Sequence, residues 1–227
     1  MGDWLKQEMP DMKNTAVEDV FNFWFPSLPD GDRSARVRQW DWWFRGGGDA
    51  EIVARFSPLL ERAIAGELDD WEREPRSRLA LILILDQFSR TIYRGTAQAF
   101  AQDERACALT ISGIELGHYT ALETPCEKTF FFLPLGHAEQ LQHLELSVQL
   151  ADALVNESLP EYRSLLEFSA AQARRQRDVV ARFSRQPHRN DILGRISTPA
   201  ELEYLAIGQL VHKQPFPPDL AQFLIQH

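Results

Sequence analysis

Residues 79–94 read LALILILDQFSRTIYR, in which seven consecutive apolar side chains lead directly into a polar end. At 100° per residue, the apolar stripe of this segment continues into Asp86 and then Arg90. These two residues are one turn apart and can form an i,i+4 ion pair. Arg94 follows one turn later. The segment therefore predicts a helix that is apolar for most of its length and charged at its end.

A helix with such a dense apolar run is expected to be buried nearly all round. Its polar end must then be partly buried as well, and buried charges need partners. Two interpretations follow. In the first, Asp86, Arg90 and Arg94 belong to a structural ion-pair network that holds helices together. In the second, they form the floor of a binding cleft.

The rest of the chain favours an all-α fold. Four capping boxes, in which a Ser or Thr is followed three residues later by Glu, are typical of helix starts: Thr15–Glu18, Thr124–Glu127, Ser158–Glu161 and Thr198–Glu201. Helical spacing of apolar residues predicts further helices, including residues 34–44, residues 103–116 and residues 160–184. From Pro134 onward one regular pattern places His137 and Leu141 on the same stripe. No stretch shows convincing strand alternation.

Helices of 12 to 25 residues with short connections predict antiparallel helix pairs stacked on one another. We expect a right-handed arrangement like that of tetratricopeptide-repeat proteins, with degenerate repeats, because no clean 34-residue repeat is visible. The predicted organisation is a lead-in over residues 1–14, a single all-helical domain over residues 15–206 and a C-terminal tail over residues 207–227. From Lys213 onward the tail is expected to be weakly ordered or lightly docked.

Composition restricts the function classes. The chain has 227 residues and a net charge of −9, which argues against nucleic-acid binding. Its longest apolar run has seven residues, and the N-terminus shows no apolar signal core. Cys107 and Cys126 form neither a disulfide framework nor a metal-ligand pair, so we expect buried, inert thiols. We therefore predict a soluble cytoplasmic protein without membrane partners; the oligomeric state is not predicted.

No GxGxxG, P-loop, GxSxG or HExxH pattern occurs in the sequence. The usual nucleotide-binding, serine-hydrolase and zinc-protease sites are therefore not predicted. His137-Ala-Glu139 matches part of a zinc-deaminase motif, but no PCxxC follows it. A metal site built from His137, Glu139, His143 and Glu145 is disfavoured, because His137 and Glu139 would lie about 200° apart around a helix. We predict no metal or cofactor, and a hydrogen-bonded, largely buried His137.

Arginines gather late in the chain. Residues 172–195 hold seven Arg against two Asp, a local charge of +5. Guanidinium groups suit carboxylates and phosphates. Arg174, Arg175 and Arg177 are expected on a solvated helix face. Residues 187–190, Pro-His-Arg-Asn, form a loop of the kind that often displays binding residues. Among the aromatics, Trp40 and Phe44 are expected in the core and Trp42 half exposed.

Several motifs occur in an order that resembles a known bacterial family. They are VFNFWFP, WWF with a Gly-rich turn and Asp, GELDDW, LDQFSRTIYRGTAQAFAQD, FFLPLGHAEQ and RFSRQPHRNDILGR-STP. Together they resemble the "domain of unknown function 924" family over residues 16–205. Ser89 stands where the family motif has Pro, and Leu146 where a charged residue is expected.

The resemblance implies an all-helical, tetratricopeptide-like fold and carries no biochemical function with it. The family's polar signature falls here on Asp86, Gln87, Arg90, Arg94, His137, Glu139, Arg182, His188, Arg189, Asn190 and Arg195.

Three functional hypotheses remain open. The leading one is a helical binding module whose groove, lined by these polar residues, takes a small anionic ligand or a peptide carboxylate. The second is an enzyme at the same site, with His137 or His188 as general acid/base, tuned by Asp86 or Glu139. In the third, the polar cluster only locks helices together.

Overall fold

The computed structural model describes residues 12–29, 31–208 and 210–224, and within these ranges it is helical and contains no strand. The all-α prediction is therefore confirmed. The α-helices are α1 (Met12–Trp24), α2 (Arg33–Phe44), α3 (Asp49–Ile64), α4 (Pro75–Leu83), α5 (Ser89–Ile92), α6 (Asp103–Glu115), α7 (Pro125–His137), α8 (Leu141–Glu157), α9 (Pro160–Phe183), α10 (Pro199–Ile207) and α11 (Pro218–Ala221).

Two of the four predicted capping boxes are formed. Thr124 caps α7 and Thr198 caps α10, each with reciprocal bonds to the Glu three residues later. The other two predictions are wrong. α1 already begins at Met12, so Thr15 lies inside the helix. α9 starts after Leu159 without a side-chain cap, and the Ser158 hydroxyl is buried without a partner. In both functioning boxes, Pro occupies the first helical turn and fixes the start.

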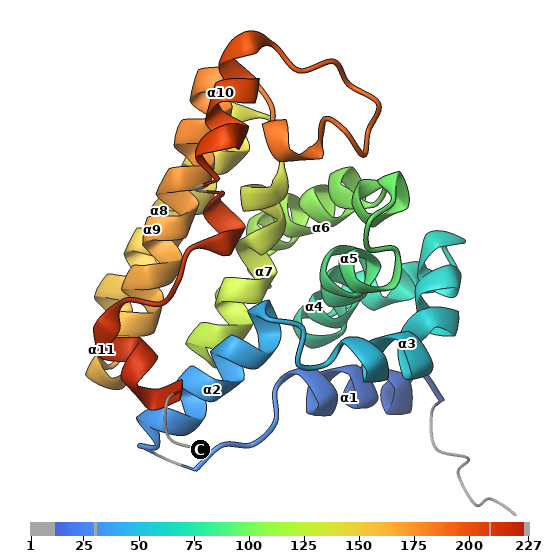
Figure 1. The fold of residues 1–227 in the computed structure, drawn as a ribbon. Helices are drawn as coiled ribbons and strands as arrows, with labels where there is room; N and C mark the ends of the chain where they lie inside the picture. The colour runs from blue at the N-terminus through green and yellow to red at the C-terminus, as the bar shows by residue number, and fades with distance from the viewer. Residues whose placement is uncertain (1–11, 30, 209, 225–227) are drawn as a thin grey trace, which may run out of the picture.

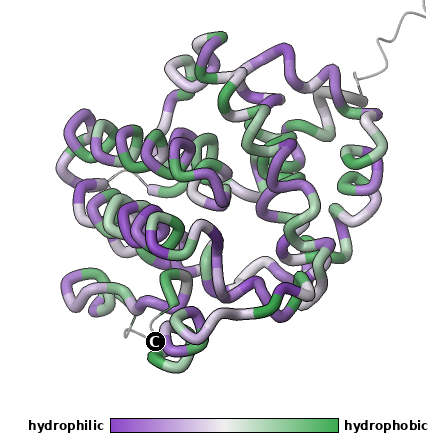
Figure 2. Tube along the Cα trace, turned by 90° about the horizontal axis from the view of Figure 1, so that it is seen from above, coloured by the Kyte–Doolittle hydropathy of each residue, from purple (hydrophilic) through white to green (hydrophobic). Residues whose placement is uncertain are grey.

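The helices are arranged around α7 (Figure 1). On one side α7 packs against α8, which lies along α9, and on the other it packs against α4 and α6. α3 contacts α5 and the turn that precedes it. Figure 2 shows hydrophilic and hydrophobic residues alternating along the helices, as expected for elements with one buried face. The tetratricopeptide-like arrangement stays a prediction.

The apolar run that begins at Leu79 forms the centre of the core. Every residue from Leu79 to Asp86 is at most 1% exposed. The run is not one continuous α-helix, because residues Ile84–Phe88 form a π-helical turn between α4 and α5, in which the Ser89 N–H bonds to the Ile84 carbonyl. Such turns often occur at functional sites. Here the turn carries Asp86 and Gln87.

A second part of the core is aromatic. Trp24, Trp40 and Trp43 are buried, and the Trp43 indole N–H donates to the Trp24 carbonyl over 2.8 Å. Trp42 is half-buried, as predicted. The prediction for Phe44 is wrong: its side chain is 42% exposed, because it lies at the end of α2, where the helix reaches the edge of a cleft.

The C-terminal segment runs down the molecule beside α9 and ends next to α2 (Figure 1). Phe216 is 8% exposed and Leu220 is fully buried, and both belong to the main hydrophobic cluster. The prediction that the tail is weakly ordered or lightly docked is therefore wrong for these two residues. None of the helices within the described ranges is long and apolar enough to cross a membrane.

Candidate functional site

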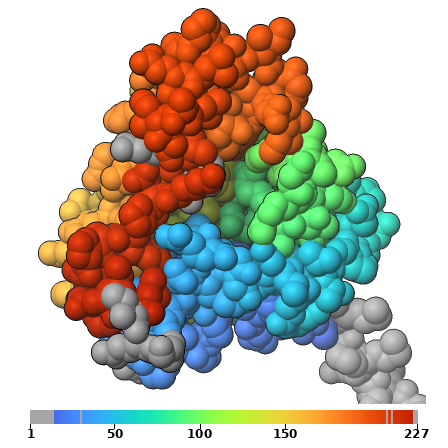
Figure 3. All heavy atoms as spheres, in the orientation of Figure 1, coloured from blue at the N-terminus to red at the C-terminus, as the bar shows by residue number. Residues whose placement is uncertain are grey.

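A central hollow opens on the face shown in Figure 3, between the C-terminal segments, the segment near residue 100 and α2. Its largest part is a cavity of about 520 Å³, which we call the arginine cleft. The polar residues of its wall are Arg90, Arg94, His137, Gln176, Gln186, His188, Arg189 and Lys213. The cleft thus brings together residues from α5, α7, α9 and the segments that follow α9 and α10.

His137 lies where this cleft meets its neighbours. It lines the arginine cleft and three further cavities of about 500, 160 and 200 Å³. His137 occupies this position because it is the last residue of α7. The backbone of the next residue, Ala138, is extended. The predicted continuous pattern through His137 and Leu141 is therefore wrong: α8 begins separately at Leu141, and Pro134 lies inside α7.

Asp86 holds the His137 side chain in place through a direct contact. Its Oδ1 atom lies 2.7 Å from His137 Nδ1 and 3.1 Å from an Arg90 guanidinium nitrogen, while Gln87 donates to Oδ2. Burial by itself raises the pKa of Asp86, but His137 and Arg90 outweigh this and hold the pKa below its ordinary value. The carboxylate is therefore ionised and accepts a hydrogen bond from Nδ1, which leaves Nε2 as the ring nitrogen that Asp86 does not contact.

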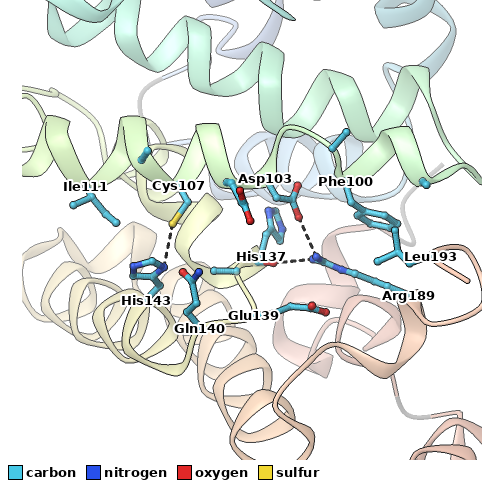
Figure 4. A pocket seen from close by; sticks show the side chains of 15 residues that line it. Phe100, Asp103, Cys107, Ile111, His137, Glu139, Gln140, His143, Arg189 and Leu193 are labelled. Carbon is cyan, nitrogen blue, oxygen red and sulfur yellow. Dashed lines mark hydrogen bonds and ion pairs between the residues drawn. The ribbon is translucent and has the colours of Figure 1, made fainter. Parts of the chain in front are cut away.

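A second carboxylate, the half-buried Asp103, joins two arginines. Arg90 reaches Oδ1 over 2.8 Å and Arg189 reaches Oδ2 over 3.0 Å. Arg189 also donates to the His137 carbonyl over 2.9 Å (Figure 4). Both guanidinium groups stack on the Phe100 ring, with centroid distances of 5.5 and 4.7 Å. Asp103 thus fixes two cations from distant segments in the wall of one cleft.

The two arginines differ in how well they are neutralised. Burial lowers the pKa of Arg90, but Asp86 and Asp103 outweigh this and raise it. Burial and the neighbouring Arg90 charge together lower the pKa of Arg189. The Nε atoms of both residues are buried without an acceptor. An additional anion near Arg189 would stabilise its charged form.

Arg94 is an accessible cation of the cleft, with a side chain that is 62% exposed. It pairs with both carboxylate oxygens of Asp49, and this hydrogen bonding raises the pKa of Arg94. Asp49 does not serve as the N-cap of α3, whose cap position is Gly48. Instead it is the first residue of that helix and directs its carboxylate to Arg94 and Thr91.

Of the remaining predicted residues, two line cavities and two pair with each other. His188 lines the arginine cleft and Gln87 lines the 200 Å³ cavity. Glu139 and Arg195 form their own bidentate pair at 2.7 and 3.0 Å, and Glu139 also accepts the Gln186 N–H. Burial raises the pKa of Glu139, but Arg195 and the Gln186 N–H outweigh this and lower it.

Asn190 is fully buried and donates to Ser197, so it holds the loop rather than lining the cleft. Arg182 is exposed on α9 and stacks on the neighbouring Phe183.

The histidines within the described residues form no metal site. His143 lies 3.4 Å from the Cys107 sulfur instead (Figure 4). Among the residues that the structure describes, no group of three or more His, Cys, Asp or Glu side chains could hold an ion. Burial, together with Asp86 and Asp103, raises the pKa of the Cys107 thiol to about 11.

Three contributors were missed at the sequence level. The sequence pattern predicts only a helix start for Asp103, a tail position for Lys213 and no role for Phe100. Asp103 and Phe100 do lie within the quoted motif LDQFSRTIYRGTAQAFAQD. For Lys213 no local signal exists, because its place in the wall depends on the path of the C-terminal segment.

Comparisons with known proteins support the helical fold and assign no function to the site. The family model for bacterial proteins of unknown function, DUF924, matches residues 20–209. A solved structure of the protein of unknown function ATU0120 from Agrobacterium tumefaciens is similar, with 32% sequence identity and a TM-score of 0.66 over 86% of this chain and 99% of that chain. The search of curated proteins gave no match. The motifs, the helical architecture and the match along most of its length show that this chain belongs to the DUF924 family.

Proposed function

We propose that the arginine cleft binds a small anionic ligand, either a carboxylate, such as the terminal carboxylate of a peptide, or a phosphate-bearing molecule. The observation that carries this proposal is the charge of the wall. Arg90, Arg94, Arg189 and Lys213 line the cleft, and no carboxylate is among the described residues that do so. The chain as a whole carries −9.

The carboxylates behind the wall do not cancel its charge. Asp49, Asp86 and Asp103 pair with the arginines, so four cations face three anions and one positive charge is in excess. Protonation of His137 or His188 would add to it. Guanidinium groups held rigidly by other carboxylates are preorganised, which lowers the entropic cost of binding an anion.

The choice of variant follows from burial. Arg90→Ala would leave Asp86 and Asp103 with a missing partner and would disturb folding as well as binding. Arg94→Gln removes a charge that is mostly exposed, so the fold should be retained. Lys213→Gln tests the cation that the C-terminal segment contributes to the wall. Arg174→Gln is the control, because Arg174 on α9 forms a comparable exposed pair with Asp152 on α8 and does not line the cleft.

The experiment is calorimetric titration with sodium acetate and with inorganic phosphate. We expect wild type and Arg174→Gln to bind at least one of these anions equally well. Arg94→Gln should bind at least tenfold more weakly, which corresponds to one lost charge-assisted hydrogen bond of roughly 1.5 kcal/mol. Circular dichroism should show equal helical content. Absence of binding by wild type, or equal binding by Arg94→Gln and Arg174→Gln, would contradict the proposal.

A second candidate is an enzyme, and the 2.7 Å contact between Asp86 and His137 favours it. A carboxylate that orients a histidine makes the opposite ring nitrogen a suitable general base. This role requires turnover of ester or phosphate substrates that is lost in His137→Gln, while a His188→Gln variant separates the two histidines. A substrate panel without turnover would leave anion binding as the function.

A further inference from the structure

A smaller chamber adjoins the arginine cleft. It has a volume of about 160 Å³, and most of its wall is apolar. α2, α7, α9 and the segment after α10 contribute Trp40, Phe44, Phe132, Leu133, Phe168 and Phe216. We call it the apolar chamber. Its walls come from the same elements that form one side of the cleft.

The chamber and the cleft share four lining residues, Phe44, His137, Gln176 and Val211. Phe44 lies at this junction with 42% of its surface exposed. An exposed aromatic side chain between an apolar and a cationic cavity gains from being covered by an apolar group. The two cavities therefore adjoin, and one has a mostly apolar wall while the other has a cationic wall.

We propose that the anionic ligand carries an apolar group that occupies the apolar chamber while its charged group lies in the arginine cleft. This inference rests on the proposed function. The chamber volume matches that of cavities of about 150 Å³ that accept a benzene molecule. The ligand class is then an anion with a phenyl group or a straight chain of about six carbons.

The polar atoms of the chamber do not contradict this assignment. Arg45 reaches the wall, but its guanidinium group lies over the Phe216 ring and 3.8 Å from Asp41. Gln172 and Gln176 are neutral amides, which tolerate an apolar neighbour better than a charge would. A second anionic group in the chamber would have to displace these contacts.

The first measurement is the affinity of wild type for acetate, butyrate, hexanoate and phenylacetate by calorimetry. Burial of a methylene group should strengthen binding about fourfold, up to roughly six carbons. Hexanoate should therefore bind far more tightly than acetate. Equal affinities across the series, combined with sensitivity to Arg94→Gln, would overturn this inference and leave the proposed function intact. Absence of binding by every carboxylate of the series and by inorganic phosphate would overturn both.

The second measurement fills the chamber. Ala173 is 6% exposed and lines it, so Ala173→Leu should remove most of the hexanoate advantage and leave acetate binding unchanged. Ala181→Leu is the matched control, because Ala181 lies exposed on the same helix. If Ala173→Leu does not fold, Ser169→Leu at the half-buried wall replaces it. Retention of the full hexanoate advantage in the folded variant would show that the apolar group binds elsewhere.

Discussion

His137 donates a hydrogen bond from Nδ1 to the Oδ1 atom of Asp86, 51 residues earlier in the chain, over 2.7 Å. The bond links the π-helical turn to the last residue of α7. Because Asp86 also binds Arg90, one carboxylate fixes both the histidine and an arginine of the cleft wall. Stability and site geometry therefore depend on the same side chain.

Asp86→Ala should lower the free energy of unfolding by about 3–5 kcal/mol, because it removes the buried member of the network and leaves the half-buried Arg90 without one of its partners. Urea denaturation followed by circular dichroism measures this loss. Asp152→Ala is the control. Asp152 pairs with Arg174 at the surface, where both side chains are 45% exposed, and the expected loss is below about 1 kcal/mol. Equal losses in the two variants would mean that the buried network adds no stability.

Acid should weaken the same network. The pKa of Asp86 is lower in the folded protein than its ordinary value of 3.8, so ionised Asp86 stabilises the fold at pH values above 3.8. This contribution is lost as the pH falls through the folded-state pKa. The difference in unfolding free energy between wild type and Asp86→Asn should be present at pH values above 3.8 and should shrink as the pH falls below that value.

Urea titrations at a series of pH values from 7 to 2 test this prediction. A second carboxylate provides an independent check, because hydrogen bonds from Arg185 lower the pKa of Glu201 to about 2. Glu201→Gln should therefore also approach wild type only below the ordinary pKa of 4.5. A difference between wild type and Asp86→Asn that does not change with pH would contradict the assignment of an ionised Asp86.

The thiols should be unreactive in the folded protein. Burial raises the pKa of Cys107 to about 11 and that of Cys126 to about 12. At pH 8 only about one Cys107 in a thousand is then a thiolate. Treatment with iodoacetamide should leave the native protein unmodified and should alkylate both cysteines in urea, as read by intact mass. Rapid alkylation of native Cys107 would show that its contact with His143 activates the sulfur.

Much of this architecture could be predicted from the sequence, because helix signals are local. Apolar spacing placed α2, α6 and α9, and the Thr124 and Thr198 boxes marked two helix starts. The two failed boxes show the limit of such a pattern. Thr15 and Ser158 are each followed by Glu at the same spacing as in the two boxes that form. However, α1 begins before Thr15, at Met12, and α9 begins only at Pro160, after Leu159.

The candidate site was predictable only in part. The i,i+4 pair of Asp86 and Arg90 follows from helical spacing and is present at 3.1 Å. The contact of Asp86 with His137 and the bridge through Asp103 are tertiary, so no spacing rule reports them. The π turn is also invisible, because it replaces one i→i+4 bond by an i→i+5 bond without a Pro or Gly to mark it.

The C-terminal segment should be an integral part of the folded unit. Leu220 is fully buried in the main hydrophobic cluster, so Leu220→Ala should lower the free energy of unfolding by about 2–5 kcal/mol. Ile196→Ala is the control, because Ile196 is 91% exposed and its truncation should change stability by no more than about 0.5 kcal/mol. Urea denaturation of both variants provides the comparison. If Leu220→Ala is as neutral as Ile196→Ala, the segment that carries Lys213 is detached in solution, and the cleft loses the wall on which the anion site depends.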